Sequence, residues 1–170
     1  PTAIRNGGWD AQRTYRLPVV LIEFSDQSFS MEKPELHYDS LFNAPGYNLG
    51  HGPGCVADYF RDQSGGLFNV QFDIIGPVKL SSSHRSNSDF NRGYSQVQQA
   101  LRACGSQLDN AAYDWDGDTY LELVIVVYAG VGGNEDSEES TGCMWPTTMS
   151  ISGTTPGGFR LTTFSSSAER

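Results

Sequence analysis

The sequence has no long apolar run, and few of its residues are basic. A membrane-spanning helix needs about 20 consecutive apolar residues, and no stretch of the 170 residues approaches this length. We therefore expect no membrane span. The 11 Lys and Arg stand against 20 Asp and Glu, which leaves a net charge of −9. Because phosphate binding depends on clustered Lys and Arg, we expect no nucleic-acid partner and favour cationic partners such as metal ions.

Cysteine is also scarce. The three cysteines, Cys55, Cys104 and Cys143, cannot all pair within one chain, and no two form the C-x-x-C arrangement of zinc or redox sites. A Cys104–Cys143 or a Cys55–Cys143 disulfide stays open, although Cys104 also fits a buried core position. Cysteine does not decide the compartment. The acidic character and the abundance of Ser, Thr, Gly and Asn favour a secreted or cell-surface protein.

Two catalytic motifs are absent. The sequence contains no H-E-x-x-H and no G-x-S-x-G, the motifs of zinc peptidases and of serine hydrolases. The three histidines, His37, His51 and His84, stand in separate segments that we expect to be loops. No two have the four-residue spacing that places both on one helical face for zinc. We therefore assign no catalytic residue and no zinc ligand to this chain.

The apolar residues that are present predict one α/β (α+β) domain over residues 1–170. Apolar residues make up 38% of the chain, enough for a core. Residues 17–24 and 121–129 are nearly continuous apolar runs, typical of strands buried on both faces. Residues 68–80 alternate until Gly76-Pro77, which favours an antiparallel or edge strand. Residues 144–151 and 159–164 predict a hairpin at a sheet edge.

Two amphipathic helices complete this prediction. Residues 55–63 place Val56, Tyr59 and Phe60 on one side and charged residues on the other. Between residues 94 and 108, apolar residues recur every three or four positions. The expected fold is a mixed twisted sheet of about four to five strands with two covering helices.

An acidic loop is the sharpest local motif. Asp114, Asp116, Asp118 and Glu122 occupy positions 1, 3, 5 and 9 of a calcium-loop spacing, where oxygen ligands can converge on one cation. The loop is not an EF-hand, because Thr119 replaces the glycine of position 6 and position 12 falls inside a predicted strand. We expect calcium to bind these four carboxylates. The alternative is an acidic turn that needs no ion, since Asp and Gly favour turns on backbone grounds.

Six segments, in order, resemble the immune inhibitor A-like bacterial zinc metallopeptidases. They are LPVVLIEFSD (17–26), VADYFRDQS (56–64), GLFNVQFDIIGPV (66–78), YDWDGD (113–118), VYAG (127–130) and MWP (144–146). The resemblance implies a zincin-like fold in which a helix carrying H-E-x-x-H follows the sheet. The two histidines of that motif bind zinc and its glutamate activates water.

On this resemblance, the chain is the N-terminal subdomain of a secreted metalloendopeptidase catalytic domain, truncated before the active-site helix. Its partners would be the missing C-terminal half of that domain and a protein or peptide substrate. It would supply the sheet scaffold and a substrate-binding edge strand within residues 144–166, and would be inactive alone. The alternative is a non-enzymatic, calcium-stabilised extracellular binding or adhesion module, for which the missing catalytic residues are equally expected.

Overall fold

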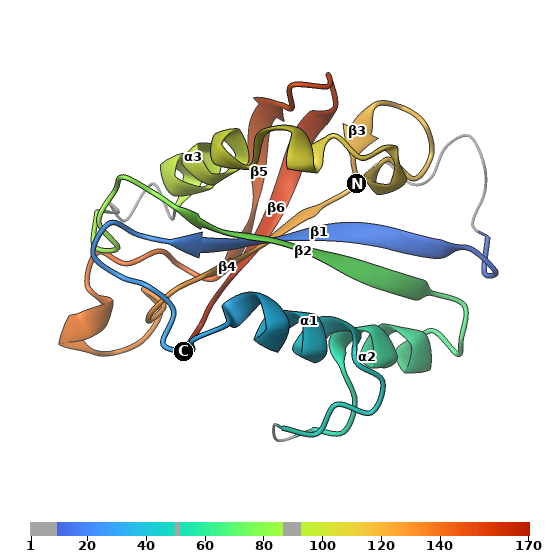
Figure 1. Ribbon diagram of the computed structural model, residues 1–170, viewed down its shortest axis with the longest axis horizontal. Helices are drawn as coiled ribbons and strands as arrows, with labels where there is room; N and C mark the ends of the chain where they lie inside the picture. The colour runs from blue at the N-terminus through green and yellow to red at the C-terminus, as the bar shows by residue number, and fades with distance from the viewer. Residues whose placement is uncertain (1–9, 50–51, 87–92) are drawn as a thin grey trace.

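In the part of the chain that the structure describes, a six-stranded mixed sheet forms the centre (Figure 1). The computed structural model describes residues 10–49, 52–86 and 93–170. The strands are β1 (Thr14–Glu23), β2 (Asn69–Lys79), β3 (Tyr120–Leu121), β4 (Val124–Tyr128), β5 (Thr147–Thr154) and β6 (Arg160–Ala168). The strand order is β2-β1-β4-β6-β3, all in parallel pairs, and β5 pairs antiparallel with β6. The predicted mixed α/β fold is confirmed.

In the described residues, three α-helices cover the two faces of the sheet. They are α1 (Pro34–Asn43), α2 (Val56–Gln63) and α3 (Tyr94–Cys104); short 3-10 turns follow at Gly105–Leu108, Ala111–Tyr113 and Glu138–Ser140. Helices α1 and α2 lie on one side of the sheet and α3 on the other (Figure 1). No helix of the described residues has the length and apolar character to cross a membrane.

Strand β1 is buried on both faces, as its apolar run predicted. Val20 and Ile22 belong to the core on the α3 side, whereas Val19 and Leu21 belong to the core on the side of α1 and α2. All four side chains are fully buried. Burial of each such side chain contributes about 1.5 to 3 kcal/mol to folding. Strand β1 therefore links the two cores and fixes the centre of the sheet.

Strand β2 occupies one edge of the sheet, as predicted, although its pairing with β1 is parallel. The register between the two strands shifts at one point. Val20 pairs with Ile75 and Ile22 pairs with Val78, so β2 has one extra residue at Gly76-Pro77. Gly76 has φ 101°, and a Cβ there would lie 2.8 Å from the carbonyl oxygen of Leu21. Glycine is therefore required at this bulge.

The predicted apolar face of α2 is correct for Val56, which packs against the core, and wrong for Tyr59. Tyr59 is 61% exposed, whereas Asp58 is buried. Asp58 accepts the backbone N–H groups of Gly46 at 2.8 Å and Cys55 at 3.1 Å, and it also pairs with Arg61. Its carboxylate caps the helix and holds the preceding loop, which satisfies backbone donors that would otherwise be unpaired.

Helix α1 was not predicted, and it changes the assignment of one histidine. His37 lies in this helix and not in a loop. His84 lies in a turn after β2, as expected, and His51 lies outside the described residues. None of the three cysteines forms a disulfide. Cys55, Cys104 and Cys143 are all buried as free thiols. Cys104 belongs to the α3 core, which confirms its predicted core position.

Candidate functional site

The acidic loop leads from the 3-10 turn Ala111–Tyr113 into β3 and is folded around the carboxylate of Asp114. Oδ1 of Asp114 accepts the backbone N–H groups of Gly117 at 2.8 Å and Asp118 at 3.1 Å, while Oδ2 accepts that of Thr119 at 2.9 Å. Three consecutive donors therefore converge on one side chain. This arrangement reverses the chain within a few residues, as Asp commonly does in turns.

Two residues of this loop have a left-handed backbone. Gly117 has φ 77°, and Thr119 has φ 72°, the one positive value among non-glycine residues in the described part of the chain. Thr119 occupies the position where a calcium loop of the EF-hand type has an invariant glycine for its sharp turn. The threonine thus adopts the conformation that the glycine would supply. The sequence mismatch at this position does not prevent the sharp turn.

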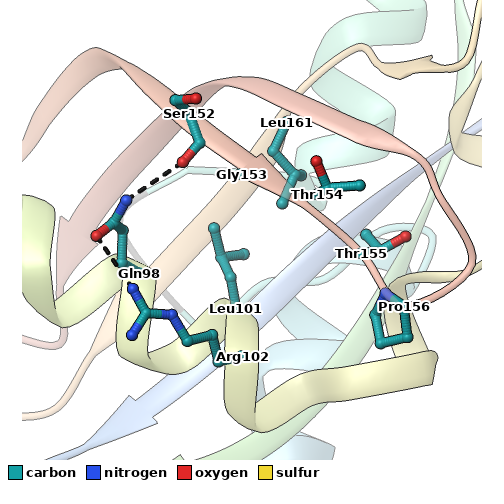
Figure 2. Close-up of a pocket in the computed structure, with 9 residues that line it drawn as sticks. All are labelled: Gln98, Leu101, Arg102, Ser152, Gly153, Thr154, Thr155, Pro156 and Leu161. Carbon is teal, nitrogen blue, oxygen red and sulfur yellow. Dashed lines mark hydrogen bonds between the residues drawn. The ribbon is translucent and has the colours of Figure 1, made fainter.

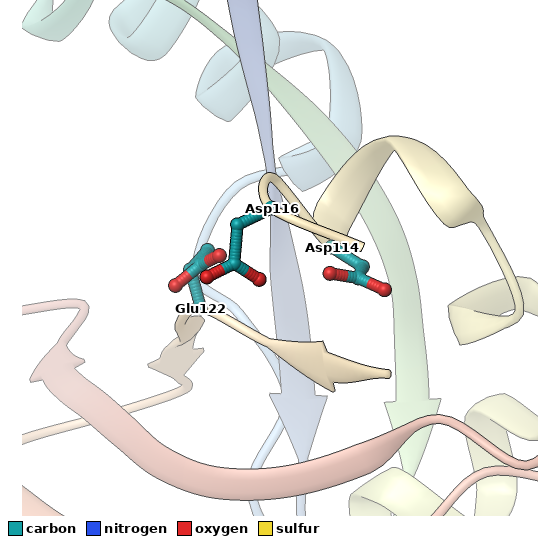
Figure 3. Close-up of side chains that lie close together, drawn as sticks. All are labelled: Asp114, Asp116 and Glu122. Atoms are coloured by element: carbon teal, nitrogen blue, oxygen red, sulfur yellow. The ribbon is translucent and has the colours of Figure 1, made fainter. Parts of the chain in front are cut away.

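Three of the four predicted ligands come together at this loop. Asp114, Asp116 and Glu122 each offer a carboxylate oxygen, and these oxygens all lie within 4.8 Å of one another (Figure 3). All three residues are half-buried. Asp118 is outside this group, and its Oδ1 accepts the backbone N–H of Tyr120 at 2.8 Å. The structure therefore separates three candidate ligands from one carboxylate that shapes the turn.

The pKa of Glu122 is raised from its ordinary value. The main cause is burial, which disfavours the charged form, and the nearby charges of Asp116, Asp118 and Asp114 add to it. A backbone hydrogen bond from Trp115 to Oε1 of Glu122, 3.2 Å long, acts in the opposite direction. Ionisation of Glu122 is therefore less favourable here than in water, and a nearby cation would offset this effect.

Trp115 anchors the acidic loop to the sheet. Its indole Nε1 donates to the carbonyl oxygen of Arg16 at 2.9 Å, and its ring lies 4.7 Å from the ring of Tyr15. Arg13 donates to the carbonyl oxygen of Trp115 at 2.7 Å. Because these contacts fix the loop to β1, the carboxylates are held together at the rim of the sheet.

This donor set is of the kind that hard cations such as calcium bind, and it lacks the His and Cys of most protein zinc sites. Calcium takes hard oxygen ligands in a flexible geometry, whereas protein zinc sites use His and Cys in addition to carboxylates. The group contains oxygen donors alone. Across the described ranges, no other group of three or more His, Cys, Asp or Glu converges closely enough to hold a metal.

A cavity of about 370 Å³ lies between α3 and strands β5 and β6 (Figure 2). Sequence patterns did not predict it, because its lining residues form no motif. The lining residues are Gln98, Leu101, Arg102, Ser152, Gly153, Thr154, Thr155, Pro156 and Leu161. The polar positions Gln98 and Arg102, four residues apart on a predicted helix, were the one available signal.

Comparisons with known proteins give no assignment. No protein-family model matches the chain. No curated protein matches its sequence either.

Proposed function

We propose that the chain is the N-terminal, sheet-forming part of the catalytic domain of a secreted zinc metalloendopeptidase. In this proposal, its sheet is the scaffold and β5 is the edge on which the peptide substrate pairs. The catalytic zinc and its ligands would come from residues outside these 170, because the sequence contains no H-E-x-x-H. When bound, the metal would supply an activated water for peptide-bond hydrolysis.

The contrast between the two edges of the sheet carries this proposal. Natural edge strands are usually protected from unwanted pairing by charge, proline or bulges. The β2 edge contains Asp73, Pro77 and Lys79. In contrast, β5 has the sequence TTMSISGT, with no charged residue and no proline, although it too contains a bulge, between Ser150 and Gly153. Within the described chain it pairs with β6 alone. The regular segment before this bulge, residues 147–150, is suited to accept an extended peptide through main-chain hydrogen bonds.

The part of the sheet at β6, on the side of α1 and α2, supports the proposal that a further helix packs there. The core beneath α1 and α2 includes residues of β2, β1 and β4, such as Val127, but no residue of β6. On the same face, β6 presents Thr163 and Ser165 half-buried and Ser167 exposed. A layer added over this part of the sheet would complete the packing that an α/β domain normally has on both faces. The zinc-binding helix of the proposal would occupy this place.

Calcium has a stabilising role in this proposal. Asp114, Asp116 and Glu122 would bind the ion, which would neutralise the carboxylates at the rim of the sheet. A calcium-stabilised binding or adhesion module is the second candidate function, because the same acidic group and the same free edge would serve it. The coding sequence that follows residue 170 separates the two candidates.

Hydrogen exchange tests the role of β5 directly. The backbone N–H of Thr147 points toward β6, where it donates to Ser166 Oγ at 3.2 Å. Since directions alternate along a strand, the N–H of Thr148 points away from β6. We expect a blocked peptide, acetyl-Thr-Val-Gln-Val-Thr-amide, to slow exchange at Thr148 and Ser150 and to leave the β2 edge unchanged.

Thr148→Pro removes one outward donor and should abolish this protection. Thr148→Val keeps the donor and the strand propensity, and serves as the matched control. Protection of β2 instead of β5, or protection that persists in Thr148→Pro, would overturn the proposed role of this edge.

A further inference from the structure

The cavity between α3 and β5 has an apolar floor and a polar rim (Figure 2). Leu101 and Leu161, both buried, form part of the floor. Gln98 and Arg102 project from α3 on one side, and Ser152, Gly153 and Thr154 of β5 line the other. A ligand here would contact apolar carbon at the floor and one positive charge at the rim, a combination that orients an amphipathic group.

A bulge in β5 forms the wall of this cavity. Ser150 pairs with Thr163 and Gly153 with Leu161, so that β5 has one residue more than β6 across this step. The carbonyl oxygen of Ser152 points toward α3, where it accepts from Gln98 Nε2 at 3.2 Å. The bulge thus turns part of the edge strand toward the helix and places the cavity beside the edge.

Arg102 provides the charge of the cavity. Its Nη2 donates to Oε1 of Gln98 at 3.4 Å, and it forms no ion pair with any residue that the structure describes. A guanidinium has five donors and favours a carboxylate as its partner. Because the whole chain has a net charge of −9, an acidic ligand would be attracted by a local feature and not by the overall charge.

We propose that this cavity is a specificity subsite for a glutamate side chain of an extended peptide that pairs on β5. The inference rests on the proposed pairing role of that strand. The two methylene groups of glutamate would lie against Leu101 and Leu161, and its carboxylate would meet Arg102. Main-chain pairing gives affinity without selecting a sequence, whereas this cavity adds a preference at one position of the peptide.

Two peptides that differ in one group test this inference. Acetyl-Thr-Val-Glu-Val-Thr-amide and its glutamine counterpart would be titrated into the chain while backbone NMR shifts are followed at β5 and α3. We expect the glutamate peptide to bind about three- to fivefold more tightly, the range of an exposed ion pair. Arg102→Gln should remove this difference. Arg85→Gln, which changes an exposed arginine at a separate cavity, should preserve it.

Gly153→Val tests the cavity without changing any charge. Gly153 does not have a left-handed backbone, and a Cβ there would lie 3.4 Å from Leu161 Cδ1, an ordinary contact. The added side chain should occupy part of the cavity and weaken the glutamate preference, while the melting temperature reports that the variant is folded.

The outcomes separate the two proposals. Equal binding of both peptides at β5 would overturn the glutamate subsite and leave the edge pairing intact. Shifts that are absent from β5 with either peptide would overturn both. A glutamate preference that survives Arg102→Gln or Gly153→Val would place the preference elsewhere on the surface.

Discussion

Thr119 donates its backbone N–H to Oδ2 of Asp114 at 2.9 Å while holding a left-handed backbone with φ 72°. For a β-branched residue this conformation is strained. The hydrogen bonds to Asp114 thus maintain a turn that the side chain of Thr119 opposes. The acidic loop combines backbone strain with the repulsion of clustered carboxylates, and both should be measurable as free energies of unfolding.

The strain predicts that Thr119→Gly stabilises the chain. Relief of the strain exceeds the extra entropy of glycine in the unfolded state, and we expect a rise of about 0.5 to 1 kcal/mol in the free energy of unfolding. Urea unfolding in EGTA measures it without a contribution from calcium. Thr119→Ala keeps the Cβ and should gain less. A glycine variant less stable than the parent chain would contradict this account of the turn.

Calcium should raise the melting temperature of the parent chain above its value in EGTA. An ion at about 100 times its dissociation constant stabilises the folded state by about 2.7 kcal/mol. Asp116→Asn keeps the shape, removes one ligand charge and should abolish most of the shift. Asp118→Asn is the matched control, because Asn can still accept from Tyr120 and the residue lies outside the converging group. Equal melting temperatures in both buffers would favour the acidic turn that needs no ion.

Glu122→Gln should have opposite effects in the two buffers. The pKa of Glu122 is raised by burial and by the neighbouring aspartates, so without calcium the folded chain binds protons more readily than the unfolded chain. Stability in EGTA should therefore fall as the pH rises from the ordinary glutamate pKa through the raised one. The neutral amide of the variant does not titrate and should remove that fall, making the variant more stable than the parent in EGTA at pH 7.

In calcium, the same variant should be less stable than the parent, because it has lost a charged ligand. Unfolding curves from pH 4 to pH 8, in each buffer, provide the comparison. If Glu122→Gln were more stable than the parent in both buffers, or less stable in both, Glu122 would not contribute to ion binding.

Much of the fold followed from the sequence because the buried strands are distinct apolar runs. Three sequence patterns each indicate one kind of surroundings for their residues. They are the apolar run of β1, the hairpin of β5 and β6, and the helical spacing of apolar residues in α3. Helix α1 was missed because its inward residues, Pro34, Tyr38 and Phe42, are separated by polar residues and by the exposed Leu36. The sequence contrast between its two faces is therefore weak.

Helix α2 shows why periodicity alone can assign single residues to the wrong side of a helix. Tyr59 was expected on the apolar side and Asp58 on the polar side, but Asp58 is buried by its backbone donors, and Tyr59 is exposed. The hydrogen bond from the distant Gly46, which sequence spacing does not reveal, contributes to this orientation. The same limit applies to the acidic loop: alternation predicted four ligands, whereas local hydrogen bonds keep Asp118 apart from the other three.

The buried carboxylate of Asp58 predicts an acid-sensitive contribution to stability. Hydrogen bonds from the backbone of Gly46 and then of Cys55 hold the pKa of Asp58 well below its usual range. A lowered pKa stabilises the folded state above the ordinary aspartate pKa of about 3.9, and this stabilisation is lost as the pH falls below it.

Asp58→Ala should therefore lower the melting temperature at pH 7 and cost progressively less as the pH decreases toward 2. Asp62→Ala, on the exposed side of the same helix, should have little effect at either pH. A deficit for Asp58→Ala that stays constant from pH 7 to pH 2 would show that the side chain acts through packing and not through its charge.

The proposed metallopeptidase function is tested most directly by the zinc content of the chain expressed together with the coding sequence that follows residue 170 in its gene. The account predicts about one tightly bound zinc per molecule and casein cleavage that stops when a zinc chelator is added. The 170-residue chain alone, which has no H-E-x-x-H, should show neither property. A longer product that binds calcium but no zinc, and that cleaves no casein, would contradict the account and favour the binding module.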